Sequence, residues 1–245
     1  MADDEFVSKT RFQHGRRQFL FGAGVAGTAA ALAQTAAEPA QAQTAVTAPA
    51  PSAQPDTYLT LTATEVAFFS ALADAFIPAD ALSPSGTDCG VVVFIDRQLA
   101  GAWGGGAKMY RAGPFAKGKP ELGYQLSLSP REYFAAGIIA VNAWTKTKHG
   151  RELDRLSTTD RDAVLKTLES GKAELESFDG KAFFEALLDI AMEGFFSDPI
   201  YGGNRDKVSW KMVGFPGLPA VYRNLIVDWR DKRFVVEPKS IADFS

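Results

Sequence analysis

Three carboxylates in the last third of the chain have the spacing that acid–base or metal chemistry requires. Glu185, Asp189 and Glu193 lie four residues apart, which places them on one face of a helix, and Asp198 follows shortly after them. Such a row can share a proton or hold a hard cation, so one interpretation is a self-sufficient enzyme with a carboxylate site. The alternative is a solvated helix face. We favour it because Lys181 can offset the charge and no second carboxylate-rich helix is evident.

A second polar set lies in the segment 193–217, where glycines and aromatic rings are concentrated. Asp198, Asn204 and Asp206 could ligate a calcium ion, but turn formation and helix capping account for them more simply. The pair Gly202-Gly203 before Asn204 favours positive φ, and the proline after Asp198 ends the preceding helix. The segment therefore predicts a structured loop that packs, binds a ligand, or does both. A stand-alone carbohydrate-binding module is one version of the binding hypothesis.

Histidine and cysteine offer little further chemistry. His149 precedes a glycine at an expected helix end, where the helix dipole favours it. Cys89 is the only cysteine, which excludes an internal disulfide, a cysteine-ligated iron–sulfur cluster and a CxxCH haem attachment motif on this chain. Its alternatives are a buried thiol, which we favour, and a disulfide to another subunit. No dinucleotide fingerprint or hydrolase motif occurs, and we assign no catalytic, cofactor-binding or metal-binding residue.

Composition narrows the class of protein. The 245 residues include 46% hydrophobic and 22% charged residues, which is ordinary for a globular protein of one or two domains. The formal net charge is −3, and no block of like charge or basic patch is visible. The charge therefore argues against nucleic acid as a partner, and strong binding to anionic lipid has no evident electrostatic source.

The first 42 residues resemble a twin-arginine signal peptide. Arg16 and Arg17 are followed by Phe19 and Leu20, then by a glycine- and alanine-rich run that ends in small residues. We expect residues 1–42 to be the signal, 43–57 a flexible leader rich in Ala, Pro and Thr, and 58–245 a single folded domain. Proteins with such signals are exported already folded, and because this chain shows no cofactor motif, we expect the signal to serve a partner.

The hydrophobic pattern predicts a mainly α domain with long loops rich in glycine and aromatic residues. The stretch 181–195 is the clearest amphipathic helix, and the almost wholly apolar stretch 133–144 predicts a central, buried one. We expect Trp103, Tyr110, Phe115 and Tyr124 to be the packing points of the irregular stretch 101–128. Further helices are predicted to begin after a capping box at Thr62 and Glu65, after Asp88, at Ser129-Pro130, at Thr158 or Thr159, and at Pro219, and the stretch 234–245 is expected to be extended.

The loop also carries a family resemblance. The sequence DPIYGGNRDKVSWKMVGFPG, together with GVVVFIDRQLAG, EGFFSDP and the closing PKSIADF, is similar to the gluconate 2-dehydrogenase subunit 3 family over roughly Leu59 to Phe244. The most specific part is YGGN followed by a tryptophan a few residues later. The motif residues, which would either shape the subunit or contact a partner, are Asp198, Pro199, Tyr201, Gly202, Gly203, Asn204 and Trp210.

The resemblance implies a non-catalytic small subunit of a membrane-bound sugar or sugar-acid dehydrogenase. The implied partners are an FAD-containing catalytic subunit, which oxidises the substrate, and a multi-haem cytochrome c subunit, which passes electrons to quinone. This chain would hold no cofactor, would support folding and twin-arginine export of the flavoprotein, and would reside in the periplasm, attached to the membrane through its partners. The substrate, among gluconate, ketogluconate, glucose, fructose and alditols, would be set by the flavoprotein.

Overall fold

The computed structural model describes residues 56–116, 118–119, 126–176 and 178–244, and these residues form helices joined by loops. The expected signal residues Arg16, Arg17, Phe19 and Leu20 lie outside the described residues, as does Tyr124. Within the described part of the chain there is no strand, and no helix is both long and apolar enough to cross a membrane. The prediction of a mainly α fold is confirmed.

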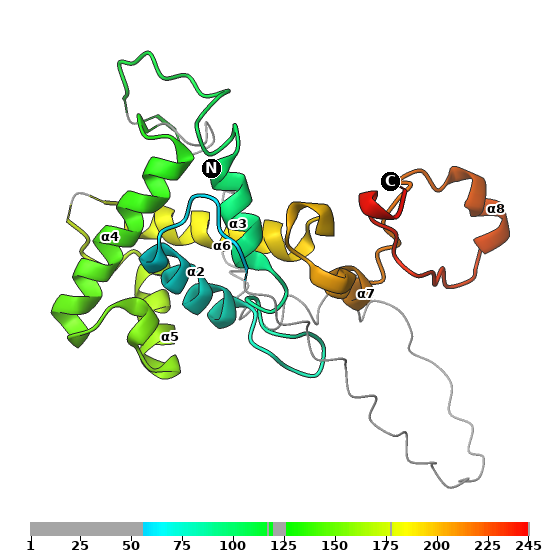
Figure 1. Cartoon of the computed structure of the whole chain (residues 1–245), viewed down its shortest axis with the longest axis horizontal. Coiled ribbons are helices and arrows are strands. Elements are labelled where there is room, and N and C mark those ends of the chain that lie inside the picture. The colour runs from blue at the N-terminus through cyan, green and yellow to red at the C-terminus, as the bar shows by residue number, and fades with distance from the viewer. Residues whose placement is uncertain (1–55, 117, 120–125, 177, 245) are drawn as a thin grey trace, which may run out of the picture. The chain divides into compact units, whose positions relative to one another are not determined.

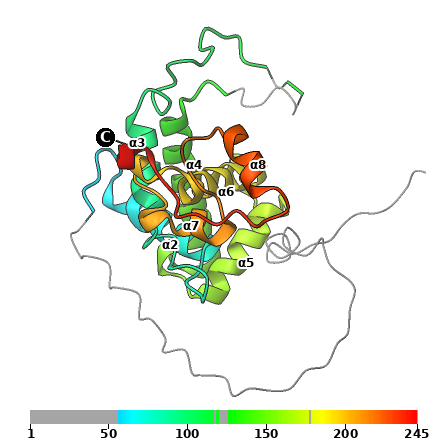
Figure 2. The ribbon, with the colours of Figure 1, turned by 90° about the vertical axis from the view of Figure 1, so that its right-hand side faces the viewer.

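Five helices make the hydrophobic core, and α6 contacts the other four (Figure 1). They are α2 (Ala63–Phe76), α3 (Val91–Ala100), α4 (Pro130–His149), α5 (Thr158–Glu169) and α6 (Gly180–Phe196). The view along the perpendicular direction places α6 among its neighbours near the middle of the helices (Figure 2). Shorter elements complete the chain: η2 (Leu153–Arg155), η3 (Pro199–Tyr201), η4 (Arg205–Lys207), α7 (Val208–Val213), η5 (Arg223–Leu225), α8 (Ile226–Trp229) and η6 (Ile241–Phe244).

Local capping signals set most of the helix starts. Thr62 and Ser129 each form a complete capping box with the glutamate three residues later, as predicted. Ser157 caps α5, so that helix begins at Thr158. The predicted cap at Asp88 is wrong, because α3 begins after Gly90, which has a φ of +83° and makes no side-chain cap, while Asp88 instead pairs with the Ser85 hydroxyl.

Aromatic side chains fill the centre of the core. The Phe183 ring of α6 is fully buried and lies 5.7 Å from the Tyr133 ring of α4. Gly137 permits this approach, because a Cβ atom at that position would stand 2.2 Å from the Phe183 ring. The expectation that α4 is central and buried is met on one face only: that face packs on the core, while Ile139 on another face is 70% exposed. An apolar sequence here does not mean complete burial.

Two predictions for the carboxy-terminal part of the chain need correction. No helix starts at Pro219; helical structure begins later, at Arg223, and Val221, which was expected to lie on that helix, is 65% exposed. The stretch from residue 234 has no helix as far as Ser240 and then forms η6, whose first amide, that of Ile241, donates to Asp198. Asp198 and Ile241 are 43 residues apart in the sequence, so no local pattern reveals this hydrogen bond.

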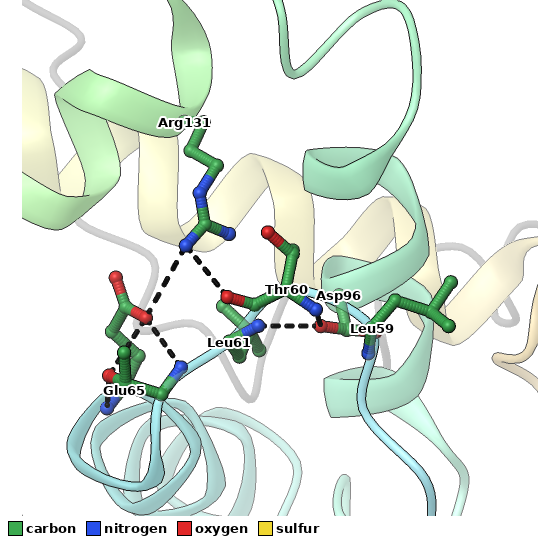
Figure 3. A network of polar contacts seen from close by, with 7 residues as sticks. Leu59, Thr60, Leu61, Glu65, Asp96 and Arg131 are labelled. Carbon is green, nitrogen blue, oxygen red and sulfur yellow. Dashed lines mark hydrogen bonds and ion pairs between the residues drawn. The ribbon is translucent and has the colours of Figure 1, made fainter.

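A buried carboxylate joins the start of the domain to α3 (Figure 3). Asp96, 1% exposed, accepts hydrogen bonds from the backbone N–H groups of Leu59, Thr60 and Leu61, at 2.6, 2.9 and 2.9 Å. Arg131 of α4 donates to the Thr60 carbonyl oxygen at 2.7 Å. Three N–H donors compensate much of the cost of burying a carboxylate, so this cluster holds the segment before α2 against α3 and α4.

Replacing Asp96 with alanine should lower the free energy of unfolding by about 3 kcal/mol, since hydrogen bonds to a charged group are lost and three backbone donors are left without their acceptor. Urea denaturation followed by circular dichroism measures the change. The control is Asp162→Ala on the exposed side of α5, which should stay within about 0.5 kcal/mol of the parent. Equal losses in the two variants would contradict the anchoring role of Asp96.

Candidate functional site

The carboxylates of α6 do not come together as one site. Glu185, Asp189 and Glu193 are all exposed, as the solvated-face interpretation expects. Glu185 faces Lys181 across one turn at 3.9 Å. Asp198 lies beyond the helix and uses its carboxylate on the backbone, with Oδ1 accepting from the Ile200 N–H and Oδ2 from the Ile241 N–H. Over the residues that the structure describes, no group of three His, Cys, Asp or Glu side chains is placed to hold a metal ion.

Two of these carboxylates do line a cleft. Asp189 and Glu193 share its wall with three aromatic residues of the irregular loop, Trp103, Tyr110 and Phe115, around a cavity of about 610 Å³. Glu193 is exposed, but partial desolvation where it lines the cleft raises the pKa of its carboxyl group, and the nearby Asp189 carboxylate raises it further. A cavity of this size, walled by rings and by two acidic groups, has the dimensions of a small-molecule site.

The three rings correct the prediction that this loop packs through its aromatic residues. Trp103, Tyr110 and Phe115 are 49%, 75% and 43% exposed. Only the first reaches the core, with its ring 6.5 Å from that of Phe134. The loop therefore presents aromatic surface to the cleft and to solvent, whereas the core takes its own rings from the helices.

The loop after α6 is organised around Asn204. This residue is fully buried in the left-handed region, at a φ of +46°. Its amide nitrogen donates to the Ser197 carbonyl oxygen at 2.9 Å, and its Oδ1 accepts from the N–H and the hydroxyl of Ser209, at 2.9 and 2.7 Å. One side chain thus joins the end of α6 to the start of α7. Asn204 is unavailable as a calcium ligand because its amide is committed to the fold.

The two glycines before Asn204 permit close backbone approaches. Gly202 has a φ of +102°, as predicted, and a Cβ there would stand 2.9 Å from Val93 and from Arg97 of α3. A Cβ at Gly203 would stand 2.0 Å from the Gly194 carbonyl oxygen of α6, a distance no real Cβ adopts. Glycine is therefore required here by the neighbours as well as by the turn.

The aromatic residues of the motif divide between the interior and the surface. Trp210 is 6% exposed, donates from Nε1 to the Phe196 carbonyl oxygen at 2.9 Å, and packs its ring 5.1 Å from that of Phe215. Tyr201, which follows Pro199 in η3, is 48% exposed. Trp210 therefore shapes the subunit itself, and Tyr201 is the motif ring that remains accessible.

Cys89 lies behind the same loop. Its thiol is 1% exposed, and the Cys89 carbonyl oxygen accepts from the Arg205 N–H at 3.0 Å. The Arg205 guanidinium also pairs with Asp56, at the start of the described chain. Burial raises the pKa of the Cys89 thiol to about 11, and the Asp88 carboxylate adds to the rise. A disulfide to another subunit would require this thiol to reach the surface.

A family model described as gluconate 2-dehydrogenase subunit 3 matches residues 63–217, more than half of the chain. The chain belongs to this family. The match begins with α2 and ends at the glycine that closes the Asn204 loop, so it contains the five core helices and every motif residue from Asp198 to Trp210. The PKSIADF stretch lies outside it. In comparisons with curated proteins and with solved structures, nothing matched the chain.

Membership in the gluconate 2-dehydrogenase subunit 3 family makes the chain a subunit of a dehydrogenase complex. The sequence motif identifies Asn204, Gly202 and Trp210, but it does not identify two residues that position them. Ser209 is fully buried against Asn204, and Arg205 bonds to the loop before α3. Arg205 follows the YGGN turn directly and Ser209 lies in α7 just beyond it, yet nothing in their type distinguishes them from solvated residues.

Asn204→Gly should lower the free energy of unfolding by about 2–4 kcal/mol, because glycine keeps the left-handed backbone but removes three side-chain hydrogen bonds and leaves Ser209 buried without them. Thermal and urea denaturation measure the loss. Asp206→Gly is the matched control, since Asp206 has a similar φ of +55° but is exposed, and this variant should be neutral or slightly more stable. Similar effects from both substitutions would show that the Asn204 side chain does not hold the loop.

The buried thiol of Cys89 should make stability fall in alkaline solution. An unfolded cysteine ionises with a pKa of about 8.5, whereas the folded one ionises at about 11, so the unfolded state loses its proton first as pH rises. The contribution is fully present below about pH 8.5 and is lost by about pH 11, on the order of 3 kcal/mol. Comparing unfolding of the parent and Cys89→Ala across this range isolates the thiol. Identical pH slopes would contradict it.

Proposed function

We propose that this protein is the non-catalytic small subunit of a periplasm-facing, FAD-dependent dehydrogenase, and that it supports the folding and twin-arginine export of the flavoprotein subunit. The observation that carries the proposal is the family match across the whole helical core. The flavoprotein would carry FAD and oxidise a sugar or sugar acid, and a multi-haem cytochrome c subunit would take the electrons. No cofactor is assigned to this chain.

The geometry of the motif supports a structural role. Its most specific polar residue, Asn204, uses its amide within the loop, and Asp198 uses both carboxylate oxygens on backbone N–H groups. Trp210 is buried. Side chains that are held in this way shape a surface and do not handle a substrate, which is what a subunit that supports a catalytic partner requires.

The amino-terminal pattern supports the export role. Arg16 and Arg17 precede Phe19 and Leu20 in the arrangement of a twin-arginine signal. A folded, FAD-loaded flavoprotein without a signal of its own could be exported only through attachment to a chain that has one. In this proposal the two subunits associate in the cytoplasm, and the small subunit directs the pair outward.

Replacing Arg16 and Arg17 together with lysine should leave the co-expressed flavoprotein in the cytoplasm, with little dehydrogenase activity or flavoprotein antigen in the periplasmic fraction. Arg11→Lys, which alters another arginine in the same region, should leave export unchanged. Cell fractionation with an acceptor-dye assay measures both. Deleting this chain altogether should also reduce the yield of FAD-loaded flavoprotein, whereas deleting only residues 1–42 should not. A flavoprotein that reaches the periplasm in the double-lysine strain would refute the export role.

A further inference from the structure

Exposed apolar side chains are frequent in residues 218–238, which we call the C-terminal arm. Six large hydrophobic side chains in it are exposed, more than a third of each lying open: Val221, Leu225, Ile226, Val227, Val235 and Val236. Val227, at 77%, is the most exposed large hydrophobic residue in the part of the chain that the structure describes. Scattered apolar residues at a surface are ordinary, but a contiguous group marks an interaction site.

The arm is held at its base by the family loop. Leu218 N–H donates to the Lys239 carbonyl oxygen at 2.8 Å, and Lys239 N–H donates to that of Pro216 at 3.1 Å, which brings the two ends of the arm together. Lys211 of α7 pairs with Glu237 at 2.9 Å. Beyond the arm, the Asp198 carboxylate accepts from the Ile241 N–H. The arm is therefore a closed loop mounted on the motif.

The arm also has an interior of its own. The Phe234 ring lies 4.9 Å from the Trp229 ring and 6.3 Å from the Tyr222 ring. Figure 1 shows α8 standing apart from the core helices α2 to α6. Compact loops with close ends and internal side-chain packing keep a defined shape, and they often carry function. The aliphatic residues that do not enter this small interior are the exposed ones.

Charge indicates what kind of surface the arm fits. Between residues 223 and 233 there are four cations, Arg223, Arg230, Lys232 and Arg233, and two anions, Asp228 and Asp231. The arm thus combines exposed aliphatic side chains with mainly basic charge, and a complementary site is an apolar groove with an acidic rim. Asp228 and Asp231 lie among these cations, so the complementary surface is mainly acidic but mixed in charge, which a protein surface provides and a uniformly anionic lipid surface does not.

We infer that the C-terminal arm docks Ile226 and Val227 into an apolar, acid-rimmed groove on the FAD-dependent subunit of the dehydrogenase. The inference rests on the proposed function for the identity of this partner. A segment of 21 residues that buries its exposed side chains supplies a large part of one side of a standard interface, which has roughly 20–30 residues. The family match ends at residue 217, just before the arm.

Ile226→Asp combined with Val227→Asp should lower capture of this chain by the co-expressed, affinity-tagged FAD-dependent subunit by about tenfold or more, because two charges would be buried in an apolar groove. The matched control is Ile139→Asp on α4, an equally exposed isoleucine outside the arm, which should be captured like the parent. Thermal denaturation of the purified variants should show folded domains, since neither site belongs to the core. Flavin fluorescence of the captured material confirms the partner.

The possible results distinguish failure of the proposed function from failure of the arm assignment. If the parent chain itself is not captured, the proposed function fails; if the parent and the double-aspartate variant are captured equally, the arm assignment alone fails. Loss of capture by Ile139→Asp as well would place the interface elsewhere and also overturn the assignment. Hydrogen exchange on the full complex gives a second measurement, because backbone amides between 221 and 236 should become protected. Arm-dependent sedimentation with phosphatidylglycerol-containing vesicles, with subunit capture intact, would favour a membrane and overturn it too.

Discussion

The structure depends on backbone segments that approach more closely than side chains allow. A Cβ at Gly90 would stand 2.3 Å from the Gly202 carbonyl oxygen, and one at Gly203 would stand 2.0 Å from that of Gly194. The loop therefore lies directly on the start of α3 and on the last turns of α6, with no side chain between them. The amide of Asn204 then satisfies the backbone and hydroxyl groups that this contact buries. The close approach of the loop and the Asn204 hydrogen bonds depend on each other, because the approach buries polar groups that need partners and the partners meet only at this distance.

From this contact the remainder of the carboxy-terminal half follows. The loop fixes α7, whose Trp210 reaches back to the Phe196 carbonyl oxygen, and α7 and the loop together hold the ends of the C-terminal arm. Asp198 serves both tasks, since one oxygen stabilises η3 and the other accepts from Ile241. The family motif therefore holds the C-terminal arm in place. The cleft with Asp189 and Glu193 lies on another part of α6, and none of the motif residues lines it.

Sequence revealed the features whose partners are near in the chain. The capping boxes at Thr62 and Ser129 close within three residues, and the stripe of α6 repeats within one helix, so local patterns were sufficient. Asp96 was not recognised, because its donors lie 35 to 37 residues away and an acidic residue inside a helix is usually solvated. The cleft was missed for a related reason. Its wall combines a loop whose rings were expected to be buried with carboxylates more than 70 residues later in the sequence.

The arrangement also explains how a chain with an exposed apolar arm can remain folded before it meets a partner. The core helices pack around α6 without any contribution from the arm, and the arm places its own Trp229 and Phe234 rings against each other. The exposed aliphatic residues of the arm therefore lower the solubility of the protein, but they do not lower the stability of its fold. Under the proposed function, this loss of solubility is tolerable only if the partner subunit covers the arm soon after the chain folds. Under the proposed function, in which both subunits are complete before export, association in the cytoplasm would cover the arm early.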